Sequence, residues 1–135
     1  MTVKSTAWAS RVLSVLRIVA GLLFLAHGLV KLFGFPAGAA PGQVPIASLF
    51  GAAAILELVG GTLVVLGLFT RPVAFLLSGQ MAIGYFMVHA PKSFYPVLNG
   101  GELAILYCFL MLYLSAAGGG SWSVDALRRG RNPSI

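Results

Sequence analysis

The feature that most constrains this chain is a series of four long apolar runs, which take up most of its 135 residues. Each run holds 19 to 23 residues. A helix of that length measures about 29–35 Å, because an α-helix rises about 1.5 Å per residue. The hydrocarbon core of a bilayer is about 30 Å thick. We therefore expect four membrane-spanning helices, over residues 12–34, 47–69, 72–90 and 98–117.

The composition indicates that lipid is the solvent for the outer surface. Apolar residues make up 59% of the chain and charged residues 9%, whereas an average soluble domain is about 25% charged. These values argue against a soluble enzyme and against a disordered chain, which needs low hydrophobicity and high net charge. The basic residues flank the apolar runs, so nucleic acid is not an expected partner. We expect one all-α membrane domain over residues 1–135, built as a four-helix bundle.

The placement of the basic residues predicts the direction of the helices. The net charge is +6, from nine basic and three acidic residues. With the N-terminus inside, Lys31 and Lys92 lie toward the outer side. Because Lys and Arg favour the cytoplasm, we expect both termini there, with residues 121–135 as a basic surface tail. The expected inner set is Lys4, Arg11, Arg71, Arg128, Arg129 and Arg131.

Most ionisable residues within the runs fall on helical stripes. In the first run, Arg17, His27 and Lys31 lie on one face, at steps of three and four residues. Each of the other runs carries a similar stripe. Ionisable residues in membrane spans usually face the bundle interior or a wet cavity, so we expect one polar cluster among the helices. Its candidate members are His27, Lys31, Glu57, Tyr85, His89, Asn99 and Glu102.

Residue counts along the helices also predict the partners within this cluster. Lys31 and Glu102 match best in height, while a pair between Arg17 and Glu57 needs a longer reach. A buried Lys–Glu pair can carry function, or it can only fix helix register. Gln80 lies off the main stripe of the third run, so we expect either a second protomer or partner, or a neighbouring helix, to cover it.

The sequence has no motif for a haem, metal or nucleotide cofactor. His27 and His89 lie at similar depth, but two histidines without a supporting motif do not predict haem. Two histidines and two glutamates are few for a zinc or di-iron site. Cys108 is the single cysteine, so the chain offers no redox pair of its own.

Five short segments together give the chain a resemblance to a known family. They are HGLVKLFG at 27–34, ELVGG at 57–61, GLFTR at 67–71, NGGE at 99–102 and GGGSWSVD at 118–125. With these segments the sequence resembles the DoxX family of small bacterial membrane proteins. The resemblance implies a four-helix bundle in the bacterial inner membrane. Its motif positions here are His27, Lys31, Glu57, Asn99 and Glu102.

The resemblance also implies a function, because some DoxX members look like membrane subunits of redox assemblies that use quinones or sulfur compounds. We therefore expect a redox-associated subunit with quinone as its candidate ligand. His27, Lys31 and Tyr85 can donate hydrogen bonds to quinone carbonyls, and Glu57 or Glu102 can take protons. Electrons would come from a soluble redox partner at the cytoplasmic face.

Two other functions fit the same sequence. The first is a non-enzymatic scaffold that anchors soluble partners at the inner face through Arg71 and the basic tail. The second is a transporter of protons or small solutes along the polar stripes, which would require a homo-oligomer because four spans are few. The residues alone leave open whether the chain has enzymatic activity.

Overall fold

The computed structural model describes residues 3–131, with side chains from residue 6 to residue 130. All regular structure in this part of the chain is helical, which confirms the all-α prediction. The side chains of Lys4 and Arg131, and residues 132–135 of the expected tail, lie outside the described residues. The helices are α1 (Val3–Phe33), α2 (Leu49–Leu66), α3 (Thr70–Gly84), η1 (Tyr85–His89, a π-helix), α4 (Pro96–Asn99), α5 (Glu102–Ala117) and α6 (Val124–Arg131).

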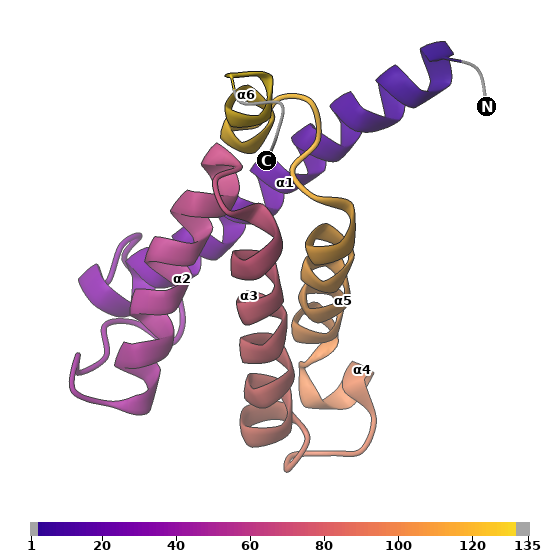
Figure 1. Cartoon of the computed structure of the whole chain (residues 1–135). Coiled ribbons are helices and arrows are strands. Elements are labelled where there is room, and N and C mark those ends of the chain that lie inside the picture. The colour runs from indigo at the N-terminus through magenta and orange to yellow at the C-terminus, as the bar shows by residue number, and fades with distance from the viewer. Residues whose placement is uncertain (1–2, 132–135) are drawn as a thin grey trace.

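The long helices form two pairs. Helix α1 packs along α2, and α3 packs along α5 (Figure 1). The turn between α2 and α3 lies near α6, at one end of the molecule, and we call this the inner end. Helix α4 and the loop that follows η1 lie at the opposite, outer end.

Three helical segments are long and apolar enough to cross a membrane: Thr6–Phe33, Leu49–Leu66 and Thr70–His89. Helix α5 is apolar but has only 16 residues. It is shorter than the predicted run because Gly100, at φ 74°, separates it from α4. The described helices therefore support a membrane protein, while the multi-pass arrangement and the fourth span stay predictions.

Arg71 and Pro72 follow the turn between α2 and α3 and do not form it. Both residues lie in the first turn of α3, where proline is tolerated because its missing N–H has no helical partner. The chain turns between Leu66 and Thr70, where Gly67 and Phe69 both take the left-handed conformation. Glycine adopts that conformation at little energetic cost.

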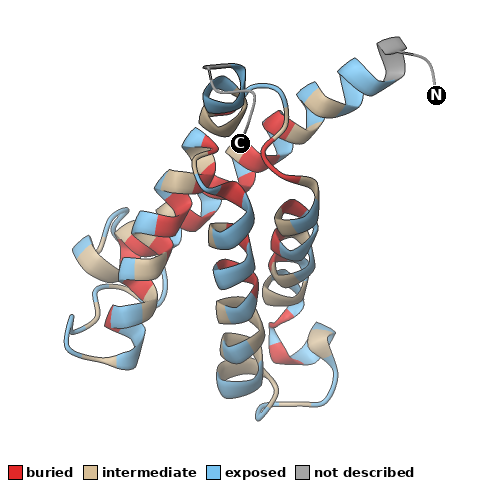
Figure 2. Ribbon diagram, viewed as in Figure 1, coloured by how far each residue is buried: buried red, intermediate tan, exposed pale blue. Residues whose placement is uncertain are grey.

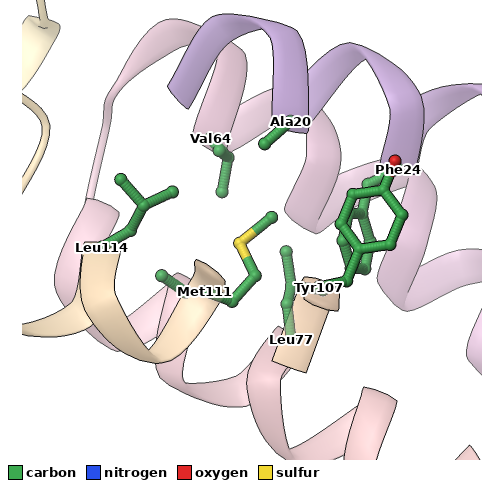
Figure 3. Close-up of a cluster of buried hydrophobic side chains, with 8 residues drawn as sticks. Ala20, Phe24, Val64, Leu77, Tyr107, Met111 and Leu114 are labelled. Carbon is green, nitrogen blue, oxygen red and sulfur yellow. The ribbon is translucent and has the colours of Figure 1, made fainter. Parts of the chain in front are cut away.

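The core lies where the two helix pairs meet, and the outward faces of the helices are largely exposed (Figure 2). Phe24 of α1 meets Tyr107 of α5 edge to face, with ring centroids 4.9 Å apart. Met111 and Leu77 fill the space beside them (Figure 3). Many large apolar side chains lie outside this core, as expected where lipid replaces water at the surface.

Glycines allow α1 and α2 to approach backbone to backbone. A Cβ atom added at Gly61 would lie 2.8 Å from the Leu25 nitrogen and 3.0 Å from the Gly21 carbonyl oxygen. One added at Gly28 would lie 2.8 Å from the Leu58 nitrogen. Small residues are the usual means of close helix contact in membranes, so these glycines set the spacing of the first helix pair.

A residue from the end of the chain caps the start of α3. The carboxylate of Asp125 accepts hydrogen bonds from the backbone N–H groups of Phe69 and Thr70, each at 3.0 Å. Its own N–H donates to the Gly67 carbonyl at 2.9 Å. Burial alone raises the pKa of the Asp125 carboxyl, but the hydrogen bonds from Thr70 and Phe69 and the charge of Arg129 outweigh it, so the pKa is lowered. Asp125 thus fastens the α2–α3 turn to α6.

We expect Gly61→Ala to lower the free energy of unfolding by about 2 kcal/mol, because the new methyl group meets backbone atoms that cannot rotate away. Gly79→Ala is the matched control, since a Cβ atom there meets no heavy atom within 4 Å. The control should stabilise the helix by about 0.5–1 kcal/mol. Reversible unfolding in mixed detergent micelles measures both, and equal effects would contradict the packing role of Gly61.

We expect Asp125→Asn to lower the free energy of unfolding at neutral pH by about 1 kcal/mol, because the amide keeps one of the two acceptor oxygens and lacks the negative charge that favours a helix N-terminus. Because the folded pKa of Asp125 is lowered, its contribution is present above the unfolded value of about 3.9 and is lost as the pH falls through the folded value. The variant should therefore lose less stability on acidification than the wild type.

Thermal unfolding measured from neutral pH down to about pH 3 tests this dependence. Glu102→Gln, which removes an exposed carboxylate, is the control and should keep the wild-type profile. Identical profiles for wild type and Asp125→Asn would show that the cap does not stabilise the fold.

Candidate functional site

The buried polar centre consists of Lys31, Glu57 and Gln80, which come from α1, α2 and α3. The Nζ atom of Lys31 lies 2.7 Å from Oε1 of Glu57, in a salt bridge. Nε2 of Gln80 donates a hydrogen bond to the same oxygen at 2.9 Å. The Glu57 side chain is only 3% exposed and that of Lys31 15%. Three helices therefore place a charged pair and an amide inside the molecule.

The fold brings these three residues together through local features of each helix. Lys31 lies in the last turn of α1, and its carbonyl accepts a hydrogen bond from Val44 in the following loop at 2.8 Å. Close contact at Gly28 holds this end of α1 against α2. Gln80 also approaches the Ala53 carbonyl, with its Nε2 atom at 3.5 Å.

Two acceptor atoms of the centre have no hydrogen-bond partner. Oε2 of Glu57 and Oε1 of Gln80 are both buried and unpaired. The orientation of the amide follows from its neighbours, because Glu57 Oε1 and the Ala53 carbonyl both require the donor nitrogen. Unpaired buried polar atoms are unfavourable, and each calls for an explanation. The centre can therefore accept hydrogen bonds from a donor that enters it.

A second polar group, the outer network, contains Tyr85, His89 and Asn99. The Asn99 amide donates to the Tyr85 hydroxyl at 3.1 Å and to the Ser93 carbonyl at 3.0 Å. The side-chain oxygen of Asn99 accepts a hydrogen bond from the Gly101 N–H at 2.7 Å. Nδ1 of His89 lies 3.1 Å from the backbone carbonyl oxygen of Asn99. Because Asn99 uses its polar atoms in this way, the network joins η1 to the start of α5.

The remaining two candidates, His27 and Glu102, are exposed. The expected single cluster of seven residues is therefore divided into a buried centre, an outer network and two exposed side chains. The functional roles of all seven residues stay predictions.

Both charge pairs expected from residue heights are wrong. Lys31 binds Glu57 instead of Glu102, because α1 packs along α2 and not along α5. Arg17 binds backbone carbonyls at the inner end, among them Trp122 at 2.8 Å, and does not pair with Glu57. Of the two explanations for Gln80, a neighbouring helix of the same bundle is confirmed.

An apolar groove of about 260 Å³ lies between α1 and α5. Leu23 and Leu106 lie on its two sides, and Tyr107 contributes to its wall. Leu16, Val19, Leu23, Leu103 and Leu106 are exposed residues that line it, so lipid chains can reach it. Among the described side chains, no three His, Cys, Asp or Glu residues are grouped closely enough to hold a metal ion.

We expect Lys31→Met to lower the free energy of unfolding by about 3 kcal/mol, because it leaves the Glu57 carboxylate buried and unpaired. The double variant Lys31→Met/Glu57→Met should recover at least half of that loss, since both charges are then removed. Unfolding of each variant in mixed micelles gives the coupling energy.

Lys92→Met removes an exposed lysine at the outer end and should stay within about 0.5 kcal/mol of wild type. The Lys31→Met and Glu57→Met single variants complete the cycle. If the double variant lost as much stability as the sum of these two single variants, Lys31 and Glu57 would not be a coupled pair.

This chain is similar to a family profile and to proteins of two bacteria. The DoxX family profile matches residues 12–90, which include the whole buried polar centre. The chain is 41% identical over 117 residues to an uncharacterized protein of Haemophilus influenzae, covering 84% of this chain and 87% of that protein. It is 28% identical over 126 residues to an uncharacterized membrane protein of Mycobacterium tuberculosis, covering 82% and 77%. No solved structure gives a significant match. From the profile match and these relatives, we conclude that the chain belongs to the DoxX family of membrane proteins.

Proposed function

We propose that this protein is the membrane subunit of a redox assembly and that it binds a quinone or hydroquinone at the buried polar centre. The observation that carries the proposal is the pair of unpaired acceptors, Glu57 Oε2 and Gln80 Oε1. A hydroquinone has two O–H donors, and such a donor can satisfy a buried acceptor. The ammonium group of Lys31 can donate to the carbonyl of the oxidised form.

The proposed chemistry needs a source of electrons outside this chain. Reduction of a quinone adds two electrons and two protons and forms two O–H bonds. We assign the electrons to a soluble redox partner at the cytoplasmic face. Glu57 can relay one proton from the aqueous side to a reduced quinone oxygen, after which its carboxylate accepts a hydrogen bond from the new hydroxyl. A proton relayed from the aqueous side supplies the second hydroxyl.

The apolar groove suits the tail of such a ligand. Quinones of biological membranes carry long hydrocarbon tails, and burial of apolar surface favours their binding by about 25 cal/mol per Å². The groove between α1 and α5 is lined almost entirely by leucine and other apolar side chains. In this proposal the tail lies along the helices while the ring reaches polar groups inside the bundle.

The proposed setting is the inner membrane of a bacterium, with α5 as the fourth span and both termini in the cytoplasm. Arg71, Arg128 and Arg129 belong to the inner end, close to the α2–α3 turn and α6. Lys92 follows η1 at the outer end. This excess of arginine at one end supports the orientation, because positive residues favour the cytoplasmic side.

A binding measurement tests the proposal. Short-tailed ubiquinone and menaquinone analogues, kept in the hydroquinone form by a chemical reductant and added to the purified protein in detergent, should raise its melting temperature. At a ligand concentration of about 100 times Kd, the stabilisation is about 2.7 kcal/mol. Glu57→Gln and Gln80→Leu should each reduce the shift at least fivefold, because they remove an unpaired acceptor. Glu102→Gln is the matched control and should keep the full shift.

No shift with either quinone type would contradict the proposal. A stoichiometric soluble protein recovered from native membranes without quinone would favour the scaffold function instead. Proton flux into liposomes that Glu57→Gln abolishes would favour the transporter, for which a buried carboxylate oxygen without a partner is also suitable. The binding, recovery and flux measurements together separate the three functions.

A further inference from the structure

Arg17 is a buried arginine at the inner end of the molecule, and only 1% of its surface is exposed. One guanidinium nitrogen donates to the Gly119 carbonyl. Another donates to the Trp122 carbonyl at 2.8 Å and lies 3.4 Å from the Val65 carbonyl oxygen. These acceptors are all neutral. The guanidinium is held in place by the backbone, but its charge is not neutralised by these contacts.

In the part of the chain that the structure describes, no carboxylate forms a salt bridge with this charge. Among the described residues, the salt bridge that forms is the one between Lys31 and Glu57. Asp125 attracts Arg17 from beyond salt-bridge distance, while its own oxygens accept hydrogen bonds from the start of α3. The Nε atom of Arg17 is buried and has no hydrogen-bond partner. A buried charge is unfavourable unless it is paired, so Arg17 still has a donor and a positive charge for an anion.

A cavity of about 370 Å³ lies beside this guanidinium, between α1, α2, the loop after α5, and α6. Arg17 and Ser123 give it a polar part, while Leu66, Trp122 and Leu127 give it apolar walls. These three apolar residues are 49%, 56% and 69% exposed. The cavity therefore joins a fixed positive charge to a surface that lipid chains can cover.

We propose that this cavity binds the phosphate group of an anionic phospholipid. A phosphate oxygen accepts from Arg17 Nε after a small shift of the side chain, and an acyl chain lies against Leu66 and Leu127. In the orientation proposed above, the inner end lies at the cytoplasmic headgroup layer, where anionic lipids attract basic residues. Tryptophan is also common at that level. The inference rests on this membrane placement and is independent of quinone binding.

Native mass spectrometry of the whole protein, released from micelles that contain equal amounts of phosphatidylglycerol and phosphatidylcholine, tests the proposal. The wild type should retain one phosphatidylglycerol in at least fivefold preference to phosphatidylcholine. Arg17→Gln should abolish that preference, although the change also removes contacts to the backbone. Leu127→Glu is therefore the second variant, because it places a negative charge at an exposed rim of the cavity. Leu127→Gln is its neutral control.

We expect Leu127→Glu to reduce phosphatidylglycerol retention at least fivefold and Leu127→Gln to reduce it less than twofold. Inorganic phosphate in excess should not displace the lipid, because it lacks the acyl chain. Equal retention of the two lipids by wild type, or unchanged preference in both Arg17→Gln and Leu127→Glu, would overturn the proposal. Full displacement by inorganic phosphate would overturn the assignment to a lipid and leave a site for the free anion.

Discussion

A charged side chain among apolar helices has no water to solvate it, and the rest of this structure depends on how the chain meets that constraint. Glu57 meets it with the Lys31 ammonium and the Gln80 amide, which come from two other helices. Arg17 meets it with backbone carbonyls of the loop after α5. Each solution requires segments from distant parts of the chain, so the charges also determine which helices must lie together.

Each of these two places keeps buried polar atoms without a hydrogen-bond partner, but the types of atom differ. At the buried polar centre, the unpaired atoms are acceptors on Glu57 and Gln80, whereas at the inner end they are the donor Nε of Arg17 and the hydroxyl oxygen of Thr70. A centre with spare acceptors suits a ligand that donates hydrogen bonds, and a spare cationic donor suits an anion. The proposed hydroquinone and the proposed lipid phosphate therefore follow from one argument applied to two places.

The rigid frame around these places comes from close packing and from one cap. Gly28 and Gly61 allow the backbones of α1 and α2 to touch, which holds Lys31 against the helix that carries Glu57. Asp125 joins the α2–α3 turn to α6, and so positions the wall of the cavity beside Arg17. A ligand at either place meets groups that the packing already holds near their bound positions, which lowers the entropy lost on binding.

The helical class, the membrane environment and the segments that become the long helices were predictable from the sequence, because apolar run length and helical period are local properties. The sequence also indicated Lys31 and Glu57 as members of a polar site. Only the tertiary structure decided their partners. Residue heights favoured a pair between Lys31 and Glu102, but heights do not specify which helices are neighbours. Because α1 packs closely against α2, Lys31 forms its salt bridge with Glu57. The same holds for Asp125 and Gln80, since their partners are distant in sequence and come near only when the helices pack.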